Sequence, residues 1–406
     1  MLEKILIVGA GQAAVQAIDT LRRKGFKGAV TLVGAEPHLP YQRPPLSKKY
    51  LSGALERDRL LVRPAHFYAE HGVETRLGCR AEHIDREARK VRLDDGSVLD
   101  YDTLLLATGS TPRQVPLPGA GRAGIYSLRN IADVDRIRAE LTPGRRLVIV
   151  GGGYIGLEVA ATARELGVAV TVLEMADRVM NRVTCPEVSS FYQSEHARHG
   201  VKIVCNARVQ AFAGGTDDRV RAVVCEDGSE HEADVVLVGV GVAPVDDLAK
   251  AAGLECANGI VVDQHCRTAD PHIFAAGDCT SHPSIHYGRH MRLESVDNAF
   301  EQATSAALNM IGMPTPHDKV PWFWSDQYDI KMIIVGLSQG HDTVVMRGSP
   351  AARSFSVCYL WNGELLAVDT INHPKDQMAA RKLVPARAKL DPDKLRDASL
   401  ALKDCL

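Results

Sequence analysis

The sequence of 406 residues lacks the cysteine patterns that build disulfide frameworks and zinc sites. Its nine cysteines are an odd number, they are scattered, and no two of them form a Cys-x-x-Cys pair. Cysteine usage of this kind is typical of reduced thiols. We therefore expect a cytoplasmic protein in which most cysteines act as small buried hydrophobic residues.

Long apolar runs and an excess of charge of one sign are also missing. No run approaches the roughly 18 apolar residues of a membrane-spanning helix. The chain begins almost at once with a predicted strand, so we also expect no cleavable signal peptide. The 48 Lys and Arg nearly balance the 50 Asp and Glu, which leaves a formal charge of -2. This balance predicts no overall attraction to nucleic acid or to a membrane.

A metal site has little support in the sequence. His282, His286 and His290 recur every four residues, and on a helix this spacing would align three imidazoles. Pro283 and Gly288 interrupt the run and argue against a helix there. We therefore predict no metal site.

The sequence does contain a strand, a glycine turn and a helix at its start. The apolar run Ile5–Val8 predicts a buried parallel strand. After it, Gly9 permits a tight turn, Gly11 lets a pyrophosphate approach the backbone, and Ala14 lets the helix pack against the strand. The next predicted strand leads to Glu36, whose carboxylate suits a ribose diol. The stretch predicts a dinucleotide site.

The same arrangement returns in the middle of the chain. A second predicted strand leads into Gly151, Gly153 and Gly156, a full Gly-x-Gly-x-x-Gly motif. The following strand ends in Glu174, near the roughly 20-residue spacing of an acid that binds the ribose 2′-OH. Two such units in one chain predict two dinucleotide sites, one for FAD and one for NAD(H).

The acid at the second site bears on the choice of nucleotide. The Glu174 carboxylate would repel a 2′-phosphate, so the sequence favours NADH over NADPH. Arg178 and Arg182 follow closely and leave NADPH as an alternative.

Short strands and turns fill the remaining chain. The Asp-Gly pairs at 95–96 and 227–228 predict two hairpins. Asp278 follows a buried strand, at the end where open α/β sheets bind ligands, with a helix cap as the simpler alternative. From about residue 321 short strands, a helix over 376–383 and a polar tail predict a small α+β domain.

Three motifs in order, Thr108–Gly109, the second glycine turn and Ala276–Asp278, give the chain a clear resemblance. It resembles the FAD- and NAD(P)H-dependent pyridine-nucleotide reductases, and within them the ferredoxin reductases of bacterial P450 and Rieske oxygenase systems. The most specific stretches are 40–48, 127–130, 293–299 and 322–327.

The resemblance implies an α/β protein of glutathione-reductase-like fold. It would have two Rossmann-type dinucleotide-binding domains and a C-terminal α+β interface domain. The FAD domain would comprise 1–112 and 243–320, with the NAD domain, 113–242, inserted between them and the interface domain at 321–406.

The resemblance also implies residue roles. The residues implied for FAD are Gly9, Gly11, Ala14, Glu36, Arg43, Lys48, Ala107, Thr108, Gly109, Arg129, Asp278, Val296 and Trp324. Lys48 would lie beside flavin N5 with Glu158 as its ion-pair partner, and these two are the candidate catalytic residues. Val296 would begin a helix whose N–H groups face the flavin C2 carbonyl. A solvated Lys48 and a core-filling Trp324 are the alternatives.

For the second nucleotide, the resemblance implies a separate set of residues. These are Gly151, Gly153, Tyr154, Ile155, Gly156, Glu174 and Gly241. The implied partners are NADH and an acidic [2Fe–2S] ferredoxin. The candidate basic docking residues are Lys375, Arg381, Lys382, Arg387, Lys389, Arg289 and Arg292. The alternative for them is an ordinary solvated surface.

The absence of cysteine before Cys79 narrows the chemistry. Disulfide reductases of this fold carry two cysteines ahead of the flavin lysine, and oxidase or peroxidase relatives carry one. Residues 40–48 have none, so electrons must leave directly from the flavin. We predict hydride transfer from NADH to FAD and then single electrons to ferredoxin. The alternatives are an NADH oxidase or peroxidase and an apoptosis-inducing-factor-like binding flavoprotein.

Overall fold

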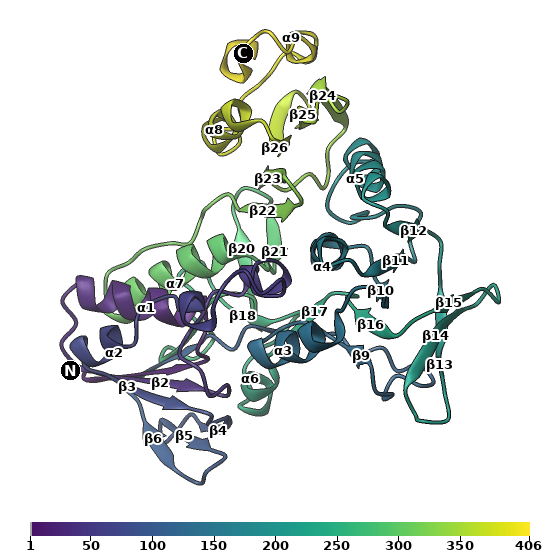
Figure 1. Cartoon of the computed structure of the whole chain (residues 1–406). Coiled ribbons are helices and arrows are strands. Elements are labelled where there is room, and N and C mark those ends of the chain that lie inside the picture. The colour runs from purple at the N-terminus through teal and green to yellow at the C-terminus, as the bar shows by residue number, and fades with distance from the viewer. Residues whose placement is uncertain (1) are drawn as a thin grey trace. The chain divides into compact units, whose positions relative to one another are not determined.

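The computed structural model describes residues 2–406. The chain forms two compact units, each built from separate segments. The first unit comprises Met1–Gln42, Asp58–Thr111 and Ala243–Trp322. The second comprises Arg43–Arg57, Pro112–Val242 and Phe323–Leu406 (Figure 1).

A five-stranded parallel sheet forms the centre of the first unit, in the order β19-β7-β1-β2-β3. Its strands are β1 (Lys4–Val8), β2 (Ala29–Gly34), β3 (Val73–Leu77), β7 (Thr103–Leu106) and β19 (Ile273–Ala275). The helices of this unit are α1 (Gln12–Arg23), α2 (His66–Glu70), α6 (Asp247–Ala251) and α7 (Val296–Met310). The smaller strands are β4 (Ala81–Asp85), β5 (Lys90–Leu93), β6 (Val98–Asp100), β18 (Ile260–Val261), β20 (Thr280–Ser284) and β21 (Arg289–Met291).

Alternate residues of β1 pack into different cores. Ile5 and Ile7 lie with apolar residues of α1 and α7, which cover one face of the sheet (Figure 1). Leu6 and Val8 lie with Val91 and other apolar residues beneath the sheet of β4, β5 and β6. Because side chains alternate along a strand, a fully apolar strand such as β1 requires cover on both faces.

The second unit contains a matching parallel sheet, in the order β12-β11-β10-β16-β9. Its strands are β9 (Ile125–Tyr126), β10 (Arg146–Val150), β11 (Ala169–Leu173), β12 (Lys202–Val204) and β16 (Val235–Val238). Its helices are α3 (Ile131–Glu140), α4 (Tyr154–Glu165) and α5 (Pro186–Arg198). A small antiparallel sheet consists of β13 (Val209–Gly214), β14 (Val220–Cys225) and β15 (Glu230–Glu232).

The C-terminal part of the second unit is a five-stranded sheet in the order β22-β23-β26-β25-β24. Its strands are β22 (Trp322–Gln327), β23 (Ile330–Gly336), β24 (Thr343–Ser349), β25 (Ser354–Trp361) and β26 (Glu364–Ile371). The helices that follow are α8 (Pro374–Leu383) and α9 (Pro392–Arg396), with a final 3-10 turn at Leu402–Cys405. Two short strands, β8 (Ser110–Pro112) and β17 (Val242–Pro244), contain two of the points at which the chain passes between units.

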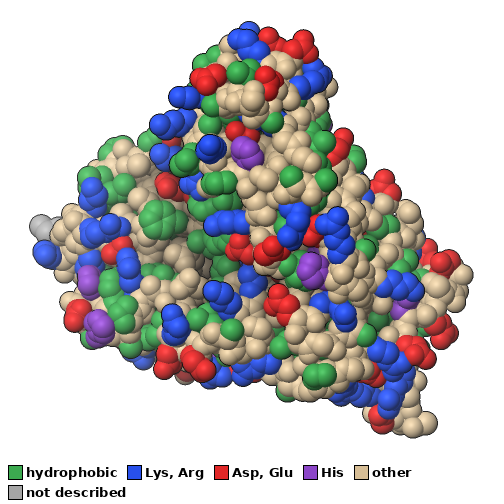
Figure 2. Space-filling model, turned by 45° about the horizontal axis from the view of Figure 1, so that its top comes forward, with side chains coloured by type: hydrophobic (Ala, Val, Ile, Leu, Met, Phe, Trp, Pro, Cys, Tyr) green, Lys and Arg blue, Asp and Glu red, His purple; other side chains and the backbone are tan. Residues whose placement is uncertain are grey.

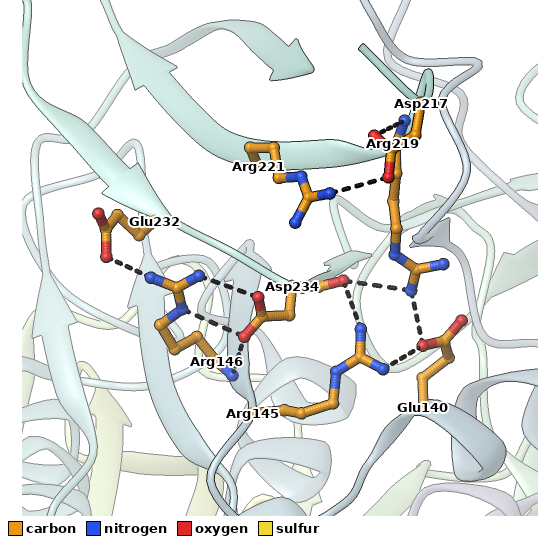
Figure 3. A network of polar contacts seen from close by, with 8 residues as sticks. All are labelled: Glu140, Arg145, Arg146, Asp217, Arg219, Arg221, Glu232 and Asp234. Atoms are coloured by element: carbon orange, nitrogen blue, oxygen red, sulfur yellow. Dashed lines mark hydrogen bonds and ion pairs between the residues drawn. The ribbon is translucent and has the colours of Figure 1, made fainter. Parts of the chain in front are cut away.

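A polar network supports the amino-terminal end of β10, away from the Gly151 turn (Figure 3). Arg146 donates to Asp234 at 2.9 Å, and Arg145 donates to Glu140 on α3 at 2.7 Å. Arg219, the residue before β14, donates to the same Glu140 at 2.6 Å. The Arg146 hydrogen bonds hold the pKa of Asp234 down to about 2. This cluster joins a helix, a strand and a hairpin, so it stabilises the fold at the end opposite the cofactor turn.

The structure confirms the predicted strand–turn–helix starts and both hairpins, and it corrects other expectations. The strand β22 and the helices α3 and α5 were not predicted. The tail after residue 390 is not simply polar, because Leu395, Leu402 and Cys405 are buried. Strand β20, rather than a helix, follows Asp278, so the helix-cap alternative for this residue is wrong.

The surface shows no broad bias toward one charge on the face drawn in Figure 2. Lys and Arg side chains are interspersed there with Asp and Glu, in keeping with the net charge of -2. Within residues 2–406, no helix is both long and apolar enough to cross a membrane.

Candidate cofactor sites

The first glycine turn combines one crowded position with one open position. Gly9 has φ +111°, and a Cβ there would lie 2.1 Å from the carbonyl oxygen of Ala107, so only glycine fits. A Cβ on Gly11, by contrast, would have no atom within 4 Å. Ala14 is fully buried in the core shared by α1 and the sheet. The turn is therefore tight on its protein side and open at the start of α1.

The starts of α1 and α4 differ from those of α3 and α7. No side chain caps Gly11 or Gly153, the N-cap residues of these two helices. In contrast, Asn130 and Ser295 cap α3 and α7 by accepting backbone N–H bonds. An uncapped start leaves N–H donors and the positive end of the helix dipole available to an anion. Both turns thus fit the pyrophosphate of a dinucleotide.

Other predicted residues of the first unit lie at the carboxyl ends of its parallel strands. Glu36, beyond β2, accepts a hydrogen bond of 2.5 Å from the Tyr41 hydroxyl. Asp278, beyond β19, accepts one of 2.7 Å from the Ser110 hydroxyl. Thr108, beyond β7, donates to the carbonyl oxygen of Val245 at 2.5 Å. The predicted set Glu36, Ala107, Thr108, Gly109 and Asp278 therefore follows three strands of one parallel sheet, β2, β7 and β19, at the same edge.

Val296 is the first residue of α7, as predicted. The Ser295 hydroxyl accepts the N–H of Asn298 at 3.1 Å, and Asp297 places a carboxylate in the same turn. Farther along this helix, Gln302 accepts from the N–H of Gly277, next to Asp278, at 2.8 Å. The helix start is therefore fixed to the loop that carries Asp278.

The second glycine turn repeats the sterics of the first. Gly151 has φ +112°, and a Cβ there would lie 2.5 Å from the carbonyl oxygen of Gly239. A Cβ on Gly156 would lie 2.3 Å from the carbonyl oxygen of Gly151, so glycine lets α4 pack closely on the turn. Gly153 faces open space, and the next two residues, Tyr154 and Ile155, form the first turn of α4, with Ile155 exposed.

Glu174 lies at the end of β11, against the second turn. Its two carboxylate oxygens accept backbone N–H bonds from Gly152 at 2.6 Å and from Ala176 at 2.8 Å. Arg178 is occupied by donating to the carbonyl oxygens of Thr184 and Asn181, at 2.8 and 3.1 Å. The carboxylate is therefore held in place, whereas Arg178 is directed toward the loop before α5.

Gly241 has φ +99° in the turn between β16 and β17, where a Cβ would lie 3.5 Å from Nη2 of Arg182. Arg182 is exposed. Unlike Arg178, it lies next to a predicted nucleotide-binding residue. It is the arginine of this region that remains a candidate for contact with NADPH.

The predicted ion pair between Lys48 and Glu158 is present in the second unit. Lys48 Nζ lies 2.6 Å from Glu158 Oε2, with the lysine 20% exposed and the glutamate 3% exposed. The Ser47 hydroxyl donates to the same oxygen at 2.6 Å, and Ser325 donates to Oε1 at 2.7 Å. Because Lys48 is largely enclosed and paired, the alternative of a solvated lysine is wrong.

Local sequence explains how Lys48 reaches this position. Pro44 begins a 3-10 turn, Pro44–Ser47, that ends directly before Lys48. Thr162 on α4 donates to the carbonyl oxygen of Ser47 at 2.9 Å, which fixes the turn against the helix that carries Glu158. Ser47 and Ser325 were not among the predicted site residues. A signal for Ser325 was its place in the aromatic run 322–327, where a small polar residue alternates inward.

Three further predicted residues of the second unit are half-buried. Arg43 donates to the carbonyl oxygen of Arg129 at 2.8 Å, so these two arginines lie side by side. Trp324 lies on β22, where its ring is 6.4 Å from that of Phe323, which in turn packs on Tyr154 at 4.7 Å. An aromatic group therefore adjoins the start of α4.

The cysteines form no disulfide among residues 2–406. All nine are unpaired, and Cys79 is the first of them in the chain. Burial raises the pKa of Cys266 to about 12 and that of Cys256 to about 11, which disfavours the reactive thiolates. In the part of the chain that the structure describes, no three His, Cys, Asp or Glu residues are placed to hold a metal ion.

Comparison with known families fits this geometry. The family model of the pyridine nucleotide-disulphide oxidoreductases matches residues 3–303, and that of the reductase C-terminal domain matches residues 322–406. The chain therefore belongs to the pyridine nucleotide-disulphide oxidoreductase family. The predicted family and fold class are confirmed.

Individual relatives are similar over the whole length. The chain is 43% identical to putidaredoxin reductase of Pseudomonas putida, over 100% of this chain and 97% of that protein. It is 42% identical to the ferredoxin–NAD(+) reductase component of the anthranilate 1,2-dioxygenase system of Burkholderia cepacia, over 100% and 99%. The crystal structure of the covalent putidaredoxin reductase–putidaredoxin complex matches with a TM-score of 0.96 at 43% identity, covering 99% of this chain and 98% of the other.

Proposed function

We propose that this protein is an FAD-dependent NADH:ferredoxin reductase that serves a P450 or Rieske oxygenase. The observation that carries the proposal is the presence of two dinucleotide turns in a chain whose segment 40–48 has no cysteine. The full-length relatives, which include reductases of both kinds of oxygenase system, support it. When bound, FAD accepts a hydride from NADH and passes electrons singly to a [2Fe–2S] ferredoxin.

The residues of the first unit are proposed to hold the FAD dinucleotide. Gly9 and Gly11 let the pyrophosphate approach the start of α1, and Ala14 allows that helix to pack closely. Glu36 would accept hydrogen bonds from a ribose, and Asp278 from a ribityl hydroxyl. Ala107, Thr108, Gly109 and Val296 complete the proposed set in this unit.

Lys48 is proposed to place its ammonium beside flavin N5, where a cation stabilises the added negative charge of the reduced cofactor. Glu158 orients this ammonium and is not required to move a substrate proton. Arg43 and Arg129 are proposed to donate to phosphate oxygens, a role that suits the guanidinium fork. Trp324 is proposed to line the flavin.

NADH is proposed to bind at the second turn. Gly151, Gly153 and Gly156 admit its pyrophosphate, and Glu174 holds its ribose diol. Tyr154, Ile155 and Gly241 would line the remainder. The direction of Arg178 away from Glu174 supports NADH over NADPH.

The domain boundaries are also a proposal. Segments 1–112 and 243–320 would form the FAD domain, 113–242 the NAD domain and 321–406 the interface domain. Two features support it. Each parallel sheet keeps its strands within the segments of one domain, and all strands of the C-terminal sheet, β22 to β26, fall within 321–406. A cytoplasmic site of action is proposed from the nine unpaired cysteines.

Steady-state oxidation of NADH tests the function. Turnover is expected to be rapid with ferredoxin and cytochrome c together, and with ferricyanide, but slow with oxygen alone. Fast oxygen consumption without ferredoxin would instead identify an NADH oxidase.

A further inference from the structure

A chain of hydrogen bonds runs through the second unit from Glu158 to the surface. Glu158 Oε1 accepts from the Ser325 hydroxyl at 2.7 Å, and Gln327 Nε2 donates to that hydroxyl at 3.2 Å. Gln327 Oε1 lies 2.8 Å from His196 Nε2, and His196 Nδ1 lies 3.1 Å from the Tyr328 hydroxyl. Ser325, Gln327 and His196 are each at most 1% exposed. We call Ser325, Gln327, His196 and Tyr328 the positioning chain.

In each hydrogen bond of the positioning chain, the donor lies on the side away from Glu158. Ser325 has one hydroxyl hydrogen, which it donates to the carboxylate, so it must accept from the Gln327 amide. This leaves the Gln327 carbonyl oxygen facing His196, and because such an oxygen only accepts, His196 Nε2 carries the proton. Burial lowers the pKa of His196 to about 4. The ring is therefore neutral near pH 7, and Nδ1 accepts from Tyr328.

The two oxygens of Glu158 have separate partners. Oε1 accepts from Ser325, at the end of the positioning chain, while Oε2 faces Lys48 and Ser47. Hydrogen bonds aligned in one direction in a buried site polarise one another and strengthen. The positioning chain therefore disperses the negative charge of the Glu158 carboxylate.

Proton conduction along the same residues is disfavoured. The amide of Gln327 would have to lose its N–H proton to Ser325 while its oxygen gained one from His196. That exchange passes through an imidic acid, which is unstable relative to the amide. A neutral His196 next to an amide suits a fixed arrangement of dipoles, not a proton relay.

The outer end of the positioning chain is anchored at the surface. The ring of Tyr328 stacks on His199, with centroids 3.7 Å apart and planes at 10°. Both residues line an open surface cavity of about 700 Å³. Removal of the Tyr328 hydroxyl therefore perturbs the positioning chain at its accessible end, which is the end farthest from Glu158.

We propose that the positioning chain disperses the negative charge of the Glu158 carboxylate, limits its pull on Lys48, and so sets how readily the bound FAD is reduced by NADH. The inference rests on the proposed place of Lys48 beside FAD. Without the Ser325 donor, the charge of Glu158 is less dispersed and draws the Lys48 ammonium more strongly to itself. The ammonium then stabilises reduced FAD less.

The test compares Ser325→Ala and Tyr328→Phe with a matched control, Ser356→Ala. Ser325 and Ser356 are both fully buried on strands of one sheet, but Ser356 Oγ has no hydrogen-bond partner within residues 2–406. The equilibrium constant for anaerobic reduction of bound FAD by NADH is expected to fall three- to tenfold in Ser325→Ala. Tenfold corresponds to about 30 mV for a two-electron couple. The equilibrium constant should also fall in Tyr328→Phe, but by less, and in Ser356→Ala it should equal the wild-type value.

A wild-type equilibrium constant in both Ser325→Ala and Tyr328→Phe would overturn the proposal, and so would an effect confined to Ser325→Ala. Each of these two variants removes a single oxygen atom, and retention of yellow FAD verifies folding. Gln327→Glu gives a second check, because its carboxylate would turn the Ser325 hydroxyl away from Glu158 and should match or exceed the loss in Ser325→Ala. The test uses no ferredoxin, so its outcome does not depend on whether ferredoxin is the electron acceptor.

Discussion

The guanidinium of Arg347 donates a hydrogen bond of 2.9 Å to Asp376, and the two side chains are only 2% and 4% exposed. The same guanidinium donates to the carbonyl oxygens of Leu395 and Leu400, at 3.0 and 2.5 Å. One side chain of β24 therefore ties down both α8 and the C-terminal tail.

Arg347→Met is expected to lower the free energy of unfolding by about 3–5 kcal/mol, because it leaves the Asp376 carboxylate buried without its partner. Denaturant unfolding measures this loss. The double variant Arg347→Met/Asp376→Leu should be more stable than the single one, since it buries no unpaired charge. Equal stabilities would show that the tail contacts, rather than the ion pair, account for the loss.

Substitutions at the two open glycines separate the two nucleotide sites. Gly11→Glu should give colourless protein without FAD, because the new carboxylate occupies and repels the pyrophosphate position. Gly153→Glu should give yellow protein that NADH reduces at least tenfold more slowly, a loss of about 1.4 kcal/mol. Absorbance of the purified proteins and stopped-flow reduction measure the two outcomes.

A control for these charge substitutions is Gly121→Glu, another position where a Cβ meets no atom within 4 Å. It should remain yellow and be reduced at the wild-type rate. If Gly11→Glu retains FAD, the first turn is not its pyrophosphate site.

Much of this arrangement could be predicted from local sequence. Gly9 and Gly151 adopt φ +111° and +112° within their own turns, a local requirement for glycine, so their motifs identify them. The alternation of polar residues around Asp-Gly turns likewise identified the hairpins. The contacts of Glu158 with Ser47 and Ser325 could not be found in this way, because they join residues more than 100 positions apart. Arg347 likewise fixes the tail by donating to carbonyl oxygens that lie far from it in the sequence. No local pattern predicts these contacts.

Glu174→Gln is expected to raise the KM for NADH about tenfold with little change in kcat, since a ribose contact contributes to ground-state and transition-state binding alike. Discrimination against NADPH should weaken at the same time, because the repelling charge is gone. Steady-state kinetics with both nucleotides measure the two effects. An unchanged ratio of kcat/KM for NADH and NADPH would remove Glu174 from nucleotide selection.

The buried carboxylate of Asp369 predicts a pH dependence of stability. Burial raises its pKa from 3.8 to about 6, against hydrogen bonds from Thr184 and Tyr359 that lower it. The folded state therefore binds more protons than the unfolded state between these values, and this contribution to stability is lost as the pH rises through about 6. Asp369→Asn should exceed the wild type in stability by on the order of 2 kcal/mol at pH 8. Below pH 4 that advantage should vanish, and parallel unfolding curves from pH 4 to 8 would contradict the raised pKa.

Docking of an acidic ferredoxin predicts a salt dependence. The apparent KM for ferredoxin should rise as the ionic strength exceeds roughly 0.15 M, where the screening length is about 8 Å. Lys375 and Lys382 are exposed on α8. The double variant Lys375→Glu/Lys382→Glu should raise this KM several-fold while ferricyanide reduction stays unchanged. A KM that does not respond to salt or to these substitutions would place docking elsewhere.

Helix α4 carries both Gly153 at its N-cap and Glu158 within its second turn. A helix rises 1.5 Å per residue, so about 7 Å of rigid backbone separates the nucleotide turn from the carboxylate that meets Lys48. Redesign of the turn for another nucleotide therefore also shifts a group proposed to tune the flavin. An engineer who changes the electron donor should expect to retune the driving force for electron delivery at the same time.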